Sequence, residues 1–282
     1  MAKRRTPFTD KNIKRMIKEG RGKGEGVKYK PWLTVQDVPS LGRSGEILGW
    51  KTGRIHHFLS KLEVKYFYNL EWPDKILDIR EQYPLFDEFD SYEETMEIAK
   101  KIGVEYPVIP KYRTPNVMTT DFLITFKVNG KEVVKAISTK YAKDLSDRRT
   151  LEKLEVERLF WERRNIDWKI ITEKQINEAL AFNVQYVHKS KTLLGYDYIT
   201  QDMIYRVEEV LRTNKHLAEK SLAEATQNVD SAFGLKDGTS LVIVRHLIAN
   251  KVWIIDMNRK IDTAKRLYLQ SVHLQRVEEV VV

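Results

Sequence analysis

An acid, a small polar residue and a lysine are predicted to meet at one end of a β-hairpin. The dipeptide Asn129-Gly130 separates two β-like runs, DFLITFKV and EVVKAISTK, which is a strong signal for a two-residue turn. The register that such a turn sets places Asp121 opposite Ser138, on the same side of the sheet. Because side chains alternate along a strand, Lys140 would share that face and Thr139 would point into the core. This constellation is the one most able to carry chemistry, and a bulge or a slipped register would undo it.

A second candidate is Glu63, which lies on a helix predicted over residues 57–72. Apolar residues recur there at helical spacing, and Glu63 falls inside their arc rather than opposite it. Burying an unpaired carboxylate costs several kcal/mol, so Glu63 should have a cation, a metal or a proton as its companion. A buried salt bridge to an arginine or lysine is the commoner alternative for a single residue of this kind.

The elements that would position these residues form a mixed α/β unit that ends near residue 172. Strands are predicted at 75–85, 121–128, 132–140 and 168–172, with a further short one around 47–50. Helices are predicted from residue 9 or 10 and over 57–72, 91–102 and 145–164. Gly22, Gly24 and Gly26 follow no strand and have no phosphate-loop spacing, so a flexible basic hinge is the favoured interpretation.

The rest of the chain has a different pattern, in which helices dominate. Residues 173–188, 197–213 and 217–227 are predicted to be helical, and 238–257 reads as one more helix that turns directly into a strand. Helices followed by a β-ribbon suggest a winged-helix-type module, although a small α+β domain fits nearly as well.

Composition excludes several classes of protein. With ten Phe, thirteen Tyr and six Trp the chain is not globally disordered, and the absence of cysteine excludes disulfides, thiolate metal sites and Cys nucleophiles. No apolar run approaches the roughly 18 residues of a membrane span, and the start has no signal-peptide core, so no membrane association and a cytoplasmic location are expected.

The positive charge is concentrated in the first fifth of the chain. The whole sequence carries a net charge of +9, and residues 1–56, with 14 basic and 5 acidic residues, account for all of it. A basic arm of this kind is typical of phosphate binding, whereas a solvated tail kept for solubility is the alternative. The residues expected to contact DNA are Lys14, Arg15, Lys18, Arg21 and Lys23.

An acid on a helix, an acid at a strand end and a lysine on the neighbouring strand form the layout of the PD-(D/E)xK nucleases. The chain resembles the TnsA family, the endonuclease subunits of heteromeric TnsA–TnsB cut-and-paste transposases. The resemblance covers most of residues 10–172 and is poor beyond about residue 190. It is carried by IKEGRGKGEGVKYKPWLTVQDVPSLGRS, KTGRIHHFLSKLEV, ILDIREQYPL, TTDFLI and RTLEKLEVERLFW.

The resemblance implies a restriction-endonuclease-like domain in which Glu63, Asp121, Lys140 and Ser138 form the catalytic set. Ser138 stands where the general motif has an acid, and the resemblance would let the Thr139 carbonyl complete a metal shell with Glu63 and Asp121. Hard oxygen ligands suit Mg²⁺, for which Mn²⁺ would substitute. The implied reaction is hydrolytic nicking at the 5′ ends of a transposable element, together with a TnsB-like transposase and a TnsC-like ATPase regulator.

The predicted organisation has three parts. Residues 1–56 form the basic arm of the catalytic unit, 57–172 the endonuclease core, and 173–282 a winged-helix-like domain that binds protein partners. Two alternatives stay open at this point: a stand-alone restriction- or resolvase-type nuclease, and a non-catalytic DNA-binding adaptor whose site has decayed.

Overall fold

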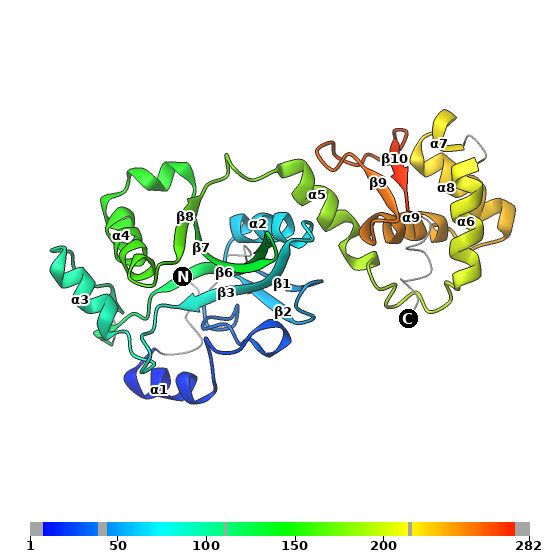
Figure 1. Cartoon of the computed structure of the whole chain (residues 1–282). Helices are drawn as coiled ribbons and strands as arrows, with labels where there is room; N and C mark the ends of the chain where they lie inside the picture. The colour runs from blue at the N-terminus through cyan, green and yellow to red at the C-terminus, as the bar shows by residue number, and fades with distance from the viewer. Residues whose placement is uncertain (1–7, 39–43, 110–111, 214–215, 274–282) are drawn as a thin grey trace. The chain divides into compact units, whose positions relative to one another are not determined.

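A computed structural model describes residues 8–38, 44–109, 112–213 and 216–273 (Figure 1). The predicted basic arm therefore falls partly outside the described residues, at 1–7 and 39–43. The chain divides into two compact units, Met1–Ile176 and Asn177–Val282, and each is described here by itself. No helix in the described ranges is long and apolar enough to cross a membrane.

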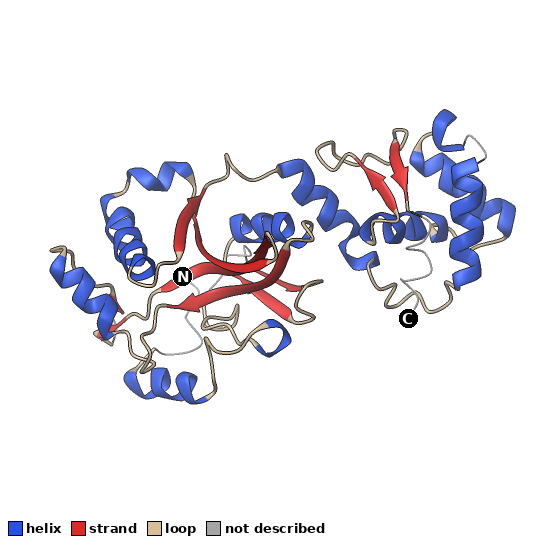
Figure 2. Cartoon of the chain, in the orientation of Figure 1, coloured by secondary structure: helices blue, strands red, loops and turns tan. Residues whose placement is uncertain are grey.

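The centre of the first unit is a four-stranded mixed sheet in the order β3-β6-β7-β8 (Figure 2). β3 (Ile76–Pro84) pairs antiparallel with β6 (Thr119–Val128), which pairs antiparallel with β7 (Lys131–Thr139). β8 (Asp167–Ile171) then joins β7 in parallel. Asn129 and Gly130 form the predicted two-residue turn, with φ angles of 49° and 80° that suit an Asn-Gly pair.

Helices cover both faces of this sheet. α3 (Glu93–Lys101) and α4 (Arg148–Glu162) share a core with Leu123 of β6. The next residue back along β6, Phe122, instead packs edge-on against an aromatic ring of α2 (Lys61–Glu71), with ring centroids 5.4 Å apart. Neighbouring strand residues point to opposite faces, so α2 and α4 lie on opposite sides of the sheet. The predicted mixed α/β unit is thus present.

Smaller elements complete the first unit. The helix α1 (Asp10–Lys18) is capped by the hydroxyl of Thr9, and its buried Ile13 and Met16 pack in one cluster with Trp32. The remaining elements are two antiparallel pairs, β1 (Gly45–Leu48) with β2 (Ile55–Phe58) and β4 (Val108–Ile109) with β5 (Thr114–Pro115), and the 3₁₀ turns η1 (Gly26–Lys28) and η2 (Ala142–Ser146).

The glycine-rich segment is packed against the sheet, so the prediction of a flexible hinge there is wrong. Gly22 and Gly24 have φ angles of 81° and 89°, and a Cβ atom added to Gly24 would lie 2.6 Å from the carbonyl oxygen of Lys28. A Cβ atom on Gly22 would lie 2.3 Å from Pro84 at the end of β3. Glycine is therefore required at these two positions, because other parts of the chain lie too close to leave room for a side chain.

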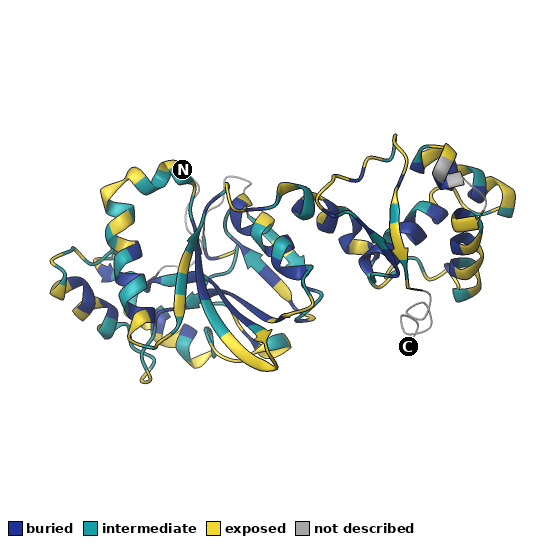
Figure 3. Cartoon of the chain, turned by 45° about the horizontal axis from the view of Figure 1, so that its top comes forward, coloured by how far each residue is buried: buried dark blue, intermediate teal, exposed yellow. Residues whose placement is uncertain are grey.

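The second unit is mainly helical and contains one antiparallel strand pair. Its helix α9 is buried along most of its length and forms the centre of this unit (Figure 3). The elements in chain order are α5 (Glu178–Val187), η3 (His188–Ser190), α6 (Gln201–Thr213), α7 (His216–Glu219), α8 (Leu222–Phe233), α9 (Thr239–Ala249), β9 (Trp253–Ile255) and β10 (Leu269–Val272). Helices followed by a two-stranded ribbon agree with the predicted order of elements, and the winged-helix assignment stays a prediction.

Several helix starts differ from the predicted ones, because side-chain caps decide where a helix begins. The hydroxyl of Ser60 accepts a hydrogen bond from the Glu63 N–H, so α2 begins at Lys61 and not at residue 57, which belongs to β2. A capping box between Ser221 and Glu224 likewise starts α8 and divides the helix predicted over 217–227.

Candidate active site

The strand β6 changes the direction of its side chains at Asp121. The predicted pairing between β6 and β7 is confirmed from the turn as far as Phe122, which pairs with Ile137. Two residues further from the turn, Thr120 donates a hydrogen bond of 2.7 Å to Glu157 of α4. Asp121 is on the opposite side, as is Phe122 with its contact to α2. Two successive side chains, Asp121 and Phe122, therefore share one face of the sheet, although the register of β6 with β3 is the same on either side of them.

This break exchanges the roles predicted for Ser138 and Thr139. The Thr139 backbone N–H and hydroxyl donate to Oδ2 of Asp121 at 2.6 and 2.9 Å, so the prediction that Thr139 points away into the core is wrong. Ser138 is buried and donates to Glu157 instead, so the prediction that it shares a face with Asp121 is also wrong. Lys140 lies beside Asp121 as predicted, with Nζ 3.4 Å from Oδ2, and it also donates to the Thr139 carbonyl at 2.9 Å.

Glu63 enters the same site from α2. Its side chain is buried, with 5% of its surface exposed, and Oε2 accepts hydrogen bonds from the Leu59 N–H at 2.9 Å and from Nε2 of Gln82 at 3.0 Å. Gln82 has a φ angle of 49°, a left-handed conformation unusual for a residue within a strand. The neighbouring pairs of β3 and β6 place Gln82 across from Asp121. The irregular positions of both strands therefore lie at one level of the sheet.

The electrostatics of the site couple the two acids and the lysine. Burial, and next the negative charge of Asp121, raise the pKa of Glu63 to about 8. The pKa of Lys140 is raised as well, chiefly by Asp121 and, against the effect of burial, by Glu157 and Glu63. Lys140 is thus held as an ammonium, whereas Glu63 tends to keep a proton unless another cation approaches.

Glu157 is a third buried acid at the edge of this group. Its Oε1 accepts hydrogen bonds from Ser138, from Thr120 at 2.7 Å and from the indole N–H of Trp168 at 2.9 Å. Burial and then Asp121 raise its pKa. The donors fix this carboxyl in place between the sheet and α4.

The two acids of α2 and β6 fit a divalent metal. The donors from Leu59 and Gln82 use Oε2 of Glu63, and those from Thr139 and Lys140 use Oδ2 of Asp121. Besides burial, the negative charge of Asp121 raises the pKa of Glu63, and a divalent cation would relieve this repulsion. Among the described residues, no group of three or more His, Asp or Glu side chains is arranged to hold a metal. A metal here would therefore need backbone, water or phosphate oxygens besides these two acids.

The adjacent histidines do not belong to this site. His56 is fully buried between the hydroxyl of Thr52 and the carboxylate of Glu81, 2.7 Å from each. Arg54 also pairs with Glu81, and although burial opposes it, His56 and Arg54 lower the pKa of Glu81 to about 2. His56 is therefore a buried packing residue.

The cations predicted to contact DNA have different surroundings. Lys14, Arg15, Lys18 and Lys23 are exposed, whereas Arg21 is half-buried. Arg21 forms an ion pair of 2.6 Å with the buried Asp37 and donates to the Trp32 carbonyl. Arg15 pairs with Glu19 at 3.6 Å, and Lys23 pairs with Asp90 at 2.5 Å.

Sequence reasoning missed Gln82 and Glu157. Leu154, Glu157 and Trp161 are spaced so that they share one face of α4, and the argument that singled out Glu63 would have singled out Glu157 too. Gln82 had no comparable signal, because a positive φ is not expected of a glutamine.

Comparison with known proteins agrees with this geometry. Residues 73–173 match the family described as "TnsA-like endonuclease N terminal", and residues 175–257 match "TnsA endonuclease C terminal". The chain is 40% identical over 250 residues to the "Transposon Tn7 transposition protein TnsA" of Escherichia coli. That match covers 89% of this chain and 87% of the relative.

Proposed function

Because the chain belongs to the TnsA family of transposition endonucleases, we propose that it hydrolyses phosphodiester bonds at the ends of a transposable element. The observation that carries the assignment of the site is the convergence of Glu63, Asp121 and Lys140 from three separate elements. The products would be a 3′-hydroxyl and a 5′-phosphate at the 5′ ends of the element.

Glu63 and Asp121 would hold Mg²⁺ or Mn²⁺, with the Thr139 carbonyl as a further oxygen ligand. The bound metal would supply a positive charge that stabilises the negative charge developing on the scissile phosphate. For this role the Glu63 carboxyl must lose its proton, and the Thr139 N–H and hydroxyl keep the Asp121 carboxylate fixed while it does so.

Lys140 would act as a cation rather than as the base. Its raised pKa keeps the amine protonated at neutral pH, so it cannot readily accept a proton from water. An ammonium held 3.4 Å from Asp121 and 2.9 Å from the Thr139 carbonyl can orient the attacking water and interact with the phosphate.

Ser138 would support the site indirectly. Its hydroxyl contacts Glu157 and faces away from Asp121, which argues against Ser138 as a metal ligand and for a role in fixing Glu157. The general motif has an acid where this chain has Ser138. The serine then need not mark a decayed site, because Glu63 and Asp121 are the acids that would hold the metal.

The finer fold and the partners belong to the same proposal. The first unit would be a restriction-endonuclease-like domain, with residues 57–172 as its core and the basic arm 1–56 beside it. The second, residues 173–282, would be a winged-helix-like domain that docks a TnsB-like transposase and a TnsC-like ATPase. Lys14, Lys18 and Lys23 would contact phosphates of the DNA, whereas Arg21 would mainly fix the arm through Asp37.

The decisive experiment is a 5′-end nicking assay on transposon-end DNA with the full-length chain and its cognate transposase. Nicking is expected with Mg²⁺ or Mn²⁺ and not with EDTA, and Asp121→Ala should abolish it. Ser138→Ala should lower nicking far less, because it removes no metal ligand. Wild-type nicking by Asp121→Ala would show that the catalytic centre lies elsewhere. Nicking without any partner would favour a stand-alone nuclease, and metal-independent binding without nicking would favour an adaptor.

A further inference from the structure

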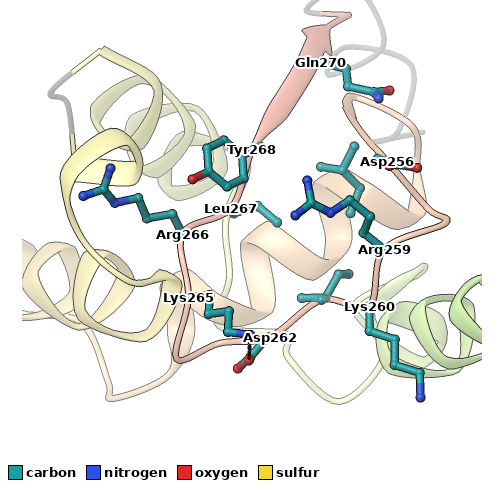
Figure 4. A pocket seen from close by; sticks show the side chains of 11 residues that line it. Asp256, Arg259, Lys260, Asp262, Lys265, Arg266, Leu267, Tyr268 and Gln270 are labelled. Carbon is teal, nitrogen blue, oxygen red and sulfur yellow. Dashed lines mark ion pairs between the residues drawn. The ribbon is translucent and has the colours of Figure 1, made fainter.

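The connection between β9 and β10 of the second unit presents a basic hollow. Residues 256–268 carry four basic residues and two aspartates. Together with Ile255 and Gln270 they line a hollow of about 260 Å³. Arg259 points into it, whereas Lys260 and Arg266 lie at its rim and point outward (Figure 4). We call these residues, 256–268, the basic loop.

The aspartates of the basic loop are engaged within it and leave most of its cations unneutralised. Asp256 accepts a hydrogen bond from a backbone N–H two residues on, and Asp262 does the same and also pairs with Lys265 at 3.5 Å. Within the described residues, Arg259 and Arg266 form no ion pair. Lys260 contacts the ring of Phe182 at 5.4 Å but likewise pairs with no carboxylate. Three positive charges thus face solvent around one hollow.

The backbone of the basic loop is fixed from two sides. The buried Asn183 of α5 donates to the carbonyls of Met257 and Arg259 at 3.1 and 2.8 Å and accepts from the Ile261 N–H at 2.8 Å. At the start of α8, two backbone N–H groups donate to the carbonyls of Lys265 and Thr263 at 2.8 and 2.9 Å. These hydrogen bonds fix the backbone that carries the cations, so little conformational entropy of the loop would be lost when a ligand binds.

We propose that the basic loop binds the sugar–phosphate backbone of double-stranded DNA, as a contact made by the second unit in addition to that of the basic arm. Guanidinium groups pair with phosphate oxygens in a planar, bidentate manner, which suits Arg259 and Arg266. Tyr268, with 67% of its surface exposed, and Gln270 add neutral donors of the kind that contact phosphates.

A duplex fits this surface better than an acidic protein. A duplex carries phosphate charges at close, regular spacing along both strands, so it can pair with the three unneutralised cations of the basic loop at once. The choice of DNA rests on the proposed function, which brings the chain to a duplex. Docking of protein partners by the same unit would use other surfaces.

The test compares two full-length variants that lose the same charge. One is Arg259→Gln, Lys260→Gln, Arg266→Gln; the control is Lys189→Gln, Lys220→Gln, Lys236→Gln, three exposed lysines of the same unit outside the basic loop. Binding to a fluorescein-labelled duplex of random sequence is measured by anisotropy in EDTA, between 50 and 200 mM salt. EDTA prevents cleavage, so the result does not depend on whether the chain is a nuclease.

Each lost phosphate contact lowers the slope of log affinity against log salt by about 0.9, so the loop variant should lose about 2 to 3 in slope and the control much less. Both variants should keep the thermal midpoint of the wild type, because all six side chains are exposed. Equal slopes for the two variants would overturn the proposal. Loss of binding to polyglutamate with an unchanged slope on DNA would also overturn it and would assign the basic loop to an acidic protein.

Discussion

Replacing Glu63 by glutamine should stabilise the protein, and by an amount that grows with pH. The carboxyl is buried, and its pKa of about 8 in the folded state compares with an ordinary value of 4.5. Above pH 4.5 the unfolded chain gives up this proton and the folded chain keeps it. Folding stability therefore falls as the pH rises from 4.5 to 8, and below that window the acid has no such cost. Glutamine is neutral throughout and avoids the loss.

The expected magnitude follows from the width of this window. One unit of pKa corresponds to about 1.4 kcal/mol, so at pH 7 the wild type should be less stable than Glu63→Gln by roughly 3 kcal/mol. At pH 5 the difference should be below about 1 kcal/mol. A glutamine oxygen can still accept from the Leu59 N–H and from Gln82, so the hydrogen bonds that hold the side chain are kept.

The assay is urea unfolding of both proteins between pH 5 and pH 8, in EDTA and then in Mg²⁺. Glu105→Gln, at an exposed position, is the matched control and should differ little from the wild type at any pH. Mg²⁺ should reduce the advantage of Glu63→Gln, because the wild-type carboxylate then gains a cation. A difference that stays constant with pH would refute the reasoning, since a buried acid that titrates cannot produce it.

Three further outcomes are expected. Asp121→Asn and Lys140→Ala should each reduce nicking by the reconstituted complex at least about 100-fold, because a ligand charge or a positioned cation is lost. Gly24→Ala should lower the thermal midpoint more than Gly103→Ala, since both have positive φ but only the first places a Cβ 2.6 Å from a backbone carbonyl. Glu157→Ala should cost about 2 to 5 kcal/mol in urea unfolding by leaving three buried donors unpaired, whereas Glu157→Gln should cost less.

Local sequence patterns correctly predicted the features that depend on residues close together in the sequence. The Asn129-Gly130 turn has the φ angles that its residues prefer, and the hairpin register follows from it for seven residue pairs. The burial of Glu63 was predicted for the same kind of reason, because position on a helix and the hydrophobic arc determine which side chains face the core. Glu157 obeys the same rule.

What the sequence could not predict depends on contacts between distant segments. Strict alternation placed Ser138 with Asp121, but Thr120 and Ser138 both reach Glu157 of α4, and the alternation of side chains along β6 breaks at Asp121. The conformation of Gln82 is likewise set by its neighbours, since nothing in a glutamine favours a positive φ. The glycine-rich segment was predicted to be flexible because Pro84, the packing partner of Gly22, lies far away in the sequence.

The irregular level of the sheet explains how the two acids come to lie on the same face. The break in the side-chain alternation of β6 turns Asp121 toward α2, where the Thr139 N–H and hydroxyl fix one of its oxygens. The left-handed Gln82 directs its amide toward α2 and fixes one oxygen of Glu63. A regular strand at either position would turn one of these groups to the α4 face. The donors thus orient both carboxyl groups, and a divalent cation bound between them would replace the proton that Glu63 keeps beside Asp121.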